Sequence, residues 1–304
     1  MVLRGGAIGD FLLTLPVLQA LRARWPDAWI EVIGYPHVAG LALAGGLVNR
    51  VESLERAGMA RFFSAIPEFP AEQIAYLRSF DFVISYLYDP TGLVRENLKR
   101  AGARVILYRS PIVESGHAIE HLMKPLESLA LYAEGERPVL DWPAEERAAG
   151  RRWLSEQGLR EPVLAVHPGS GSPKKNWPAD RFVELARRAS ADAGCSFFYL
   201  LGEADRGIAG ALAGMDPERP VLKEASLRQV ASALSACRLY VGNDSGITHL
   251  AAALGIPTVA LFGPSDAARW GPRGPRVRVI RAPGSELHEV RVESVLQVVR
   301  ELLA

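Results

Sequence analysis

Residues 240–266 read YVGNDSGITHLAAALGIPTVALFGPSD and predict a strand, a tight turn, a helix and a second strand. The first apolar run ends at Val241, and a Gly/Asn/Asp/Ser turn follows it. An apolar helical pattern then continues until Gly255 stops it. This order is typical of parallel α/β sheets, which present the N–H groups of such turns at the carboxyl edge of the sheet.

The turn within this stretch is a candidate binding site for a nucleotide diphosphate. Ser245 and Gly246 offer N–H groups at a helix N-terminus, and Gly246 has no side chain to keep phosphates away. A second turn, at Gly263, follows the next strand at the same edge. Asp244 is explained equally well as a helix cap, and His249 as a core imidazole, because such residues are common at turns.

A third loop, HPGSGSPKKNWP at residues 167–178, joins a predicted strand to a helix. Ser170 lies in its Gly/Ser part and Lys175 at its end. Loop amides and a lysine ammonium suit the oxygens of a diphosphate, and a lysine can neutralise a leaving diphosphate without a metal ion. The alternative is a solvated loop with two surface lysines.

The start of the chain repeats the strand–turn–helix order in RGGAIGDFLLTLPVLQALRARWP, residues 4–26. Gly6 and Gly9 lie in the turn, but the dinucleotide fingerprint G-x-G-x-x-G would place its first glycine at Arg4, so a nicotinamide site is disfavoured. Asp10 follows the last glycine, where a carboxylate commonly caps a helix. Such a carboxylate can also act as a general base.

Apolar β-type runs alternate with helical patterns throughout, which predicts parallel sheets with helices on both faces. Polar and Pro-rich residues ahead of 145 indicate a domain boundary near that position. We therefore expect two Rossmann-like domains, at residues 1–145 and 146–285, facing across a cleft, which is the GT-B fold. A final helix within 286–304 is expected to pack back onto the first domain. The predicted strands are 1–3, 29–35, 50–54, 80–86, 104–108, 162–169, 196–202, 239–244 and 257–263.

Composition narrows the class of protein further. The chain has 304 residues, 49% hydrophobic and 23% charged, and its formal net charge of +1 gives no electrostatic footprint for nucleic acid. No apolar run reaches the roughly 18 residues of a membrane span, and no signal peptide is recognisable. We therefore expect a cytoplasmic protein with at most peripheral contact at the inner leaflet of the membrane. Cys195 and Cys237 are expected to be packed thiols.

The three glycine-rich stretches together resemble glycosyltransferase family 9, the heptosyltransferases of the lipopolysaccharide inner core. The resemblance runs over nearly the whole chain. It implies an inverting GT-B enzyme. We expect no metal and no cofactor, because no Asp-x-Asp pair follows a predicted strand and Lys175 with backbone amides can serve the diphosphate. Such an enzyme moves a sugar from a nucleotide-diphosphate donor, typically ADP-heptose, to a glycolipid or oligosaccharide acceptor.

The resemblance also implies roles for single residues. Asp10 would be the general base, and Lys175 would touch the diphosphate. Asp244 would hold hydroxyls of the donor sugar. The donor phosphates would be surrounded by Ser245, Gly246 and His249, and Glu203 matches the place of a carboxylate that binds the ribose.

Two other functions have to be weighed. HAIEH at residues 117–121 has the H-x-x-E-H form of inverted zinc peptidases, with both imidazoles expected on one helix face, but no clear third ligand follows. The stretch is better explained as a solvent-lined helix near the cleft, where either His117 or His121 could meet the acceptor, and the role of the two histidines stays open. The chain is alternatively a nucleotide-sugar or glycolipid binding protein without turnover, although binding alone does not require a base at Asp10.

Overall fold

The computed structural model describes residues 1–133 and 135–303 and divides the chain into two compact units, Met1–Arg137 and Pro138–Ala304. This division lies ahead of the boundary expected near residue 145. The Leu140 N–H donates to the Ala253 carbonyl at 2.8 Å, and the Trp142 indole N–H donates to Ser232 Oγ at 3.3 Å. Residues 138–142, which lie ahead of the expected boundary, therefore already belong to the second unit.

The first unit contains a five-stranded parallel sheet in the order β3-β2-β1-β4-β5. Its strands are β1 (Val2–Leu3), β2 (Glu31–Gly34), β3 (Arg50–Ser53), β4 (Val83–Ser85) and β5 (Ile106–Tyr108). Its helices are α1 (Ile8–Leu12), α2 (Leu15–Arg24), α3 (Pro36–Ala44), α4 (Ala57–Ala60), α5 (Ala71–Arg78), α6 (Leu93–Arg100) and α7 (Ala118–Met123), with 3-10 turns η1 (Arg61–Phe63) and η2 (Lys124–Leu129).

The second unit contains a six-stranded parallel sheet in the order β11-β10-β9-β6-β7-β8. Its strands are β6 (Val163–His167), β7 (Ser196–Leu201), β8 (Val221–Lys223), β9 (Leu239–Asn243), β10 (Thr258–Phe262) and β11 (Val277–Arg281). Its helices are α8 (Ala144–Glu156), α9 (Ala179–Ala193), α10 (Arg206–Met215), α11 (Leu227–Ser235), α12 (Gly246–Ala253), α13 (Ala267–Trp270) and α14 (Val292–Leu303). Four 3-10 turns complete it: η3 (Pro173–Lys175), η4 (Glu203–Asp205), η5 (Pro283–Ser285) and η6 (Leu287–Glu289).

Both sheets follow the doubly wound order, in which the chain starts in the middle of the sheet and then reverses direction. The reversal falls between β1 and β4 in the first unit and between β6 and β9 in the second. Ligands of such sheets bind outside the carboxyl ends of these central strands. The loops after β1, β4, β6 and β9 are therefore the places to look for a site.

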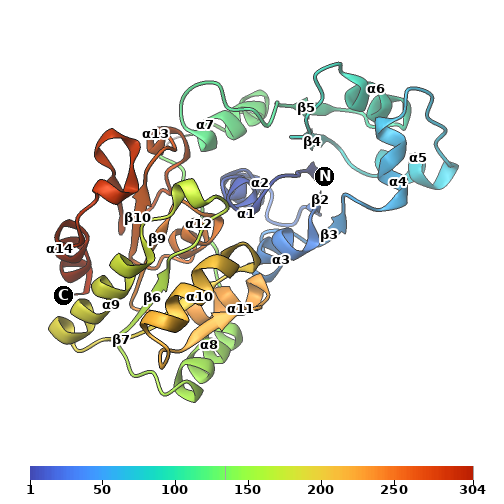
Figure 1. Cartoon of the computed structure of the whole chain (residues 1–304). Helices are drawn as coiled ribbons and strands as arrows, with labels where there is room; N and C mark the ends of the chain where they lie inside the picture. The colour runs from blue at the N-terminus through green and yellow to red at the C-terminus, as the bar shows by residue number, and fades with distance from the viewer. Residues whose placement is uncertain (134, 304) are drawn as a thin grey trace. The chain divides into compact units, whose positions relative to one another are not determined.

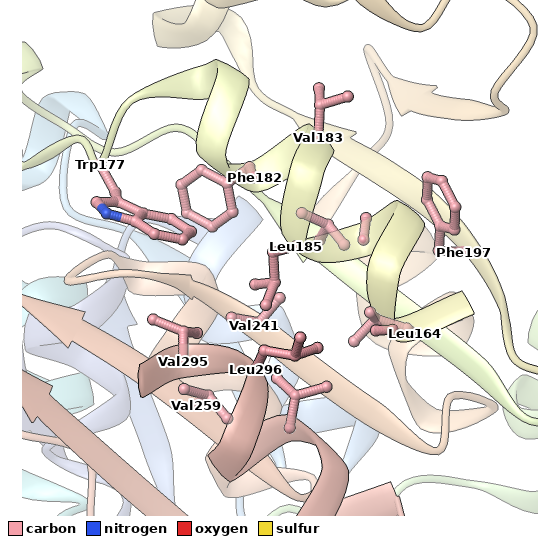
Figure 2. Close-up of a cluster of buried hydrophobic side chains, with 14 of the residues drawn as sticks. Leu164, Trp177, Phe182, Val183, Leu185, Phe197, Val241, Val259, Val295 and Leu296 are labelled. Carbon is pink, nitrogen blue, oxygen red and sulfur yellow. The ribbon is translucent and has the colours of Figure 1, made fainter. Parts of the chain in front are cut away.

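The core of the second unit fills the space between its sheet and the helices α9 and α14, which lie beside each other in Figure 1. Figure 2 shows the side chains of this cluster, in which the ring of Trp177 meets that of Phe182 edge to face with centroids 4.9 Å apart. Burying each large apolar side chain contributes about 1.5–3 kcal/mol. The loop that carries Trp177 is thereby anchored to the core.

The final helix corrects one expectation. Val295, Leu296 and Val299 of α14 are buried in the core of the second unit, and the helix contacts α9, β9 and β10. The apolar face that was expected to pack on the first domain is thus occupied within the second unit.

The predicted strands are confirmed in position, with ends trimmed by one to three residues. Two strands, β8 and β11, were not predicted. β11 carries Arg278 and Arg281 among valines and is partly exposed at one end of the sheet, so it lacks the continuous apolar run of a central strand. No helix in the described part of the chain is long and apolar enough to cross a membrane.

Candidate active site

Asp10 is the third residue of α1, directly beyond the carboxyl end of β1. Its Oδ2 accepts the Ala7 N–H at 2.9 Å, so the carboxylate caps the helix as expected. Its Oδ1 lies 3.8 Å from Nη2 of Arg4, and the Asp10 side chain is 39% exposed. One carboxylate oxygen is therefore held by the backbone while the group as a whole remains open to a ligand.

Arg4 stabilises the turn that joins β1 to α1. It is buried, and its Nη2 donates to the Asp10 carbonyl at 2.9 Å while its Nε donates to Thr14 Oγ1 at 3.0 Å. Burial lowers the pKa of the Arg4 guanidinium, and the Asp10 carboxylate opposes that shift. Arg4 occupies the position where the dinucleotide fingerprint needs its first glycine, and it stabilises the turn instead.

Gly6 is required by the conformation of the turn. Its φ is +101°, and a Cβ built there would lie 2.9 Å from both Cβ and Oδ2 of Asp10. Gly9 is the second residue of α1. A side chain at Gly6 would displace the Asp10 carboxylate.

In the second unit, Lys175 and Asp244 form an ion pair at the carboxyl ends of β6 and β9. Lys175 Nζ donates to Asp244 Oδ2 at 2.8 Å, and the two side chains are 37% and 9% exposed. Lys175 ends the turn η3, and Asp244 directly follows β9. The structure therefore brings these two predicted residues together at the topological switch point of the sheet.

The helix α12 begins immediately after this pair. Ser245 is its N-cap and accepts the Thr248 N–H at 3.3 Å, while Gly246 is the first helical residue. His249 is buried within the helix, in agreement with a core imidazole. The hydroxyl of Ser245 is used by the cap, so the backbone N–H groups are what this terminus offers a ligand.

The loop after β6 is held in shape by its own polar side chains. Ser170 Oγ lies 2.8 Å from the Ser172 carbonyl and 2.6 Å from Asn176 Oδ1. The Asn243 side chain donates to the Pro168 carbonyl at 2.8 Å and accepts the Trp177 N–H at 3.0 Å. Ser170 therefore shapes the loop through its hydroxyl, and its contact with the donor stays a prediction.

The structure also shows the surroundings of two further predicted residues, Glu203 and Gly263. Glu203 is exposed in η4, and no contact joins it to Lys175 or Asp244 among the described interactions. A Cβ on Gly263 would lie 2.9 Å from Leu287 Cγ and 3.0 Å from the Ser285 carbonyl. Gly263 is thus needed for the close approach of the segment after β11.

A buried polar chain beneath the loops was not predicted. His167 Nε2 lies 3.3 Å from Asp205 Oδ2, and its Nδ1 lies 3.2 Å from the Tyr240 hydroxyl and 3.3 Å from Ser245 Oγ. The Tyr240 hydroxyl lies 3.0 Å from Thr248 Oγ1. Burial raises the pKa of Tyr240, so this hydroxyl stays protonated. Nothing in the spacing of these residues signals their contact, because they come from separate strands, turns and a helix of the unit.

The histidines of HAIEH do not form the expected pair on one helix face. His117 precedes α7 as its N-cap, with Nδ1 accepting the Ile119 N–H at 3.2 Å. His121 Nε2 lies 2.7 Å from the Ser110 carbonyl, and burial lowers the pKa of this imidazole. Within residues 1–133 and 135–303, no group of three His, Cys, Asp or Glu side chains is placed to hold a metal ion.

Comparison with known proteins gives consistent results. The chain is 38% identical to lipopolysaccharide heptosyltransferase 2 of Escherichia coli over 301 aligned residues, which cover 90% of this chain and 85% of that one. It is 32% identical to lipopolysaccharide heptosyltransferase 1 of Pseudomonas aeruginosa, over 90% and 81% of the two chains.

Solved structures share the fold. A glycosyltransferase family 9 structure from Veillonella parvula superposes with a TM-score of 0.80 at 21% identity, covering 99% of this chain and 96% of that one. The Escherichia coli ADP-heptose lipopolysaccharide heptosyltransferase II gives 0.79 at 22% identity, covering 99% and 98%. These likenesses confirm the predicted GT-B fold class, with its two Rossmann-like parallel sheets.

The family model of glycosyltransferase family 9 (heptosyltransferase) matches residues 96–299, which include the Lys175–Asp244 pair and the start of α12. Together with the identity to curated relatives over most of the chain, this match confirms the resemblance seen in the sequence, and the chain belongs to glycosyltransferase family 9.

Proposed function

We propose that this enzyme transfers a heptose from ADP-heptose to a lipopolysaccharide-core acceptor with inversion at the anomeric carbon. The observation that carries the donor side is the Lys175–Asp244 pair beside the N-terminus of α12, at the switch point of the second sheet. Relatives over most of the chain are lipopolysaccharide heptosyltransferases, and one solved structure of the same fold is a heptosyltransferase with ADP-2-deoxy-2-fluoro heptose.

In this proposal the donor diphosphate lies against the N-terminus of α12, where the backbone N–H groups of Ser245 and Gly246 meet its oxygens. Lys175 neutralises the charge that grows on the diphosphate as the bond to the anomeric carbon breaks. Asp244 accepts hydrogen bonds from hydroxyls of the donor sugar. Glu203 and His249 are proposed as lesser donor contacts, at the ribose and near the phosphates.

The acceptor chemistry belongs to Asp10. An acceptor hydroxyl attacks the anomeric carbon, its proton passes to Asp10, and ADP leaves with the electron pair of the broken C–O bond. The contacts of Asp10 with Ala7 and Arg4 hold the carboxylate at the carboxyl end of β1. We propose that no divalent metal takes part.

We also propose that the chain works in the cytoplasm and meets a glycolipid acceptor by peripheral membrane contact. Cys195 and Cys237 are free, buried thiols, which are typical of a reducing compartment. The thiol pKa of Cys195 is raised by burial, so it is a packed group and no nucleophile.

The test is an ADP-release assay with ADP-heptose and a lipopolysaccharide acceptor that lacks heptose, with the product identified by mass spectrometry. We expect ADP release that depends on the acceptor and a product heavier by one heptose. Tight binding of ADP-heptose without any turnover would instead support the non-catalytic binding protein. Transfer only from a different nucleotide sugar would contradict the proposed donor.

A further inference from the structure

The buried polar chain of the second unit joins three segments that surround the proposed donor site. His167 ends β6, Asp205 ends the turn η4 after β7, and Ser245 caps α12. His167 and Asp205 are 4% and 3% exposed. A chain of buried polar groups is costly unless every member has a partner, so its presence needs a reason beyond packing.

Asp205 determines the direction of the hydrogen bonds. Its Oδ2 accepts the Gly202 N–H at 2.7 Å and lies 3.3 Å from His167 Nε2. Burial acts to raise the pKa of Asp205, but the hydrogen bonds from His167 and Gly202 outweigh it and the pKa is lowered. An ionised carboxylate only accepts, so His167 donates from Nε2; in the imidazole tautomer with its single proton there, Nδ1 accepts.

Because His167 Nδ1 accepts, the directions of the hydrogen bonds from the neighbouring hydroxyls can be assigned as well. Thr248 Oγ1 donates to the Asn243 carbonyl, which leaves it an acceptor toward the Tyr240 and Ser245 hydroxyls. One of these two hydroxyls therefore donates to His167 Nδ1 and the other to Thr248 Oγ1. Every polar group from Asp205 to the cap of α12 then has a partner.

Two glycines leave room for this chain. A Cβ on Gly169 would lie 1.9 Å from Asp205 Oδ1, and a Cβ on Gly242 would lie 2.3 Å from the Tyr240 hydroxyl. Both distances are shorter than any tolerated contact, so neither position accepts a side chain without moving the network. The backbone of the loop after β6 thus rests directly on the Asp205 carboxylate.

We infer that Asp205 is a positioning residue for the nucleotide diphosphate: acting through His167, it holds the loop after β6 and the N-terminus of α12 in the arrangement that binds the donor. This inference rests on the proposed function, because it takes the same helix terminus as the diphosphate site. Asp205 itself does not touch the ligand.

The test compares Asp205→Asn with Asp216→Asn. Asp216 is a second buried carboxylate of the same unit, which accepts from the Tyr199 hydroxyl and from Arg187, each at 3.0 Å. Both variants are expected to lower Tm. Only Asp205→Asn should weaken ADP binding in calorimetry, by about 5- to 30-fold, as loss of one or two hydrogen bonds predicts. KM for the donor should rise by a similar factor, with kcat changed less.

Two further measurements distinguish positioning from plain destabilisation. In ¹⁵N spectra of histidine-labelled protein, the His167 ring, identified among six histidines by its loss in His167→Gln, should show the Nε2–H tautomer and lose it in Asp205→Asn. His167→Gln alone should raise the ADP dissociation constant by the same factor, and adding Asp205→Asn to it should give no further rise. His167→Gln also serves as the test where Asp205→Asn does not fold.

Several outcomes would overturn the inference. Unchanged ADP affinity in Asp205→Asn, or an equal loss in Asp216→Asn, would make Asp205 a merely structural residue. Additive effects of the His167 and Asp205 changes would show that they act separately. Failure of the unaltered protein to bind ADP would count against the proposed function and against this inference with it, whereas ADP binding that ignores Asp205 would overturn this inference alone.

Discussion

Replacing Lys175 by Ala separates its role in stability from its role in donor binding. The change removes an ammonium 2.8 Å from a carboxylate that is 9% exposed, so Asp244 is left nearly buried and without that cation. Leaving such a group unsatisfied costs about 1–3 kcal/mol, and we take about 1–2 kcal/mol because Lys175 is 37% exposed and water can replace part of the contact. At about 2–4 °C for each kcal/mol in domains of this size, Tm should fall by about 2–8 °C.

The same variant should impair the reaction. A charge-assisted hydrogen bond to the diphosphate is worth about 1.5–3 kcal/mol, so kcat/KM should fall by about 10- to 150-fold. Lys174→Ala is the matched control, because Lys174 is exposed in the same turn, and it should change stability by less than about 0.5 kcal/mol. The assays are thermal unfolding and ADP release with varied donor.

The double variant Lys175→Ala with Asp244→Asn completes the experiment. Neutralising Asp244 removes the unpaired charge, so Tm should return toward that of the unaltered protein while kcat/KM stays low. Equal losses in the two lysine variants, or recovery of both Tm and activity in the double variant, would refute the assignment of Lys175 to the diphosphate.

The remaining predictions concern the first unit, the metal and pH. Asp10→Asn should lower turnover by about 10²- to 10⁴-fold while calorimetry finds ADP affinity unchanged; a smaller loss of turnover would argue against a general base. Gly6→Ala should lower the free energy of unfolding in urea by about 1–3 kcal/mol and remove most of the activity, since the φ of Gly6 is +101°. Gly40→Ala should be neutral or stabilising, because the added Cβ would meet nothing within 4 Å. Activity should survive excess chelator, and loss that magnesium or manganese restores would contradict this. Because the pKa of Asp205 is lower in the folded state, its stabilisation is complete above about pH 4 and is lost as pH falls through the folded pKa, so Asp205→Asn should flatten that part of the stability curve measured by circular dichroism.

The loops that form the candidate site could be predicted from the sequence. Strand ends followed by glycine-rich turns identified the loops after β1, β6, β9 and β10, because parallel strands place their carboxyl ends at one edge of the sheet. Lys175 and Asp244 were predicted separately and proved to be in contact. The packing of α14 was not predictable, since an amphipathic helix shows in its sequence that it has an apolar face but not which surface covers it.

The buried polar chain could not be predicted from the sequence for a different reason, which Gly242 illustrates. From the sequence, Gly242 was interpreted as part of a phosphate-binding turn. In the structure it lies within β9 and pairs with His167 of β6. Tyr240 lies two residues earlier on the same face, so its phenol crosses the space that a Gly242 side chain would fill and reaches the imidazole. The contact thus depends on the register between β6 and β9, which no local pattern encodes. Residues that bind a ligand through backbone groups could be read from turns, whereas the side chains that hold those turns in place became visible only when the strands were paired.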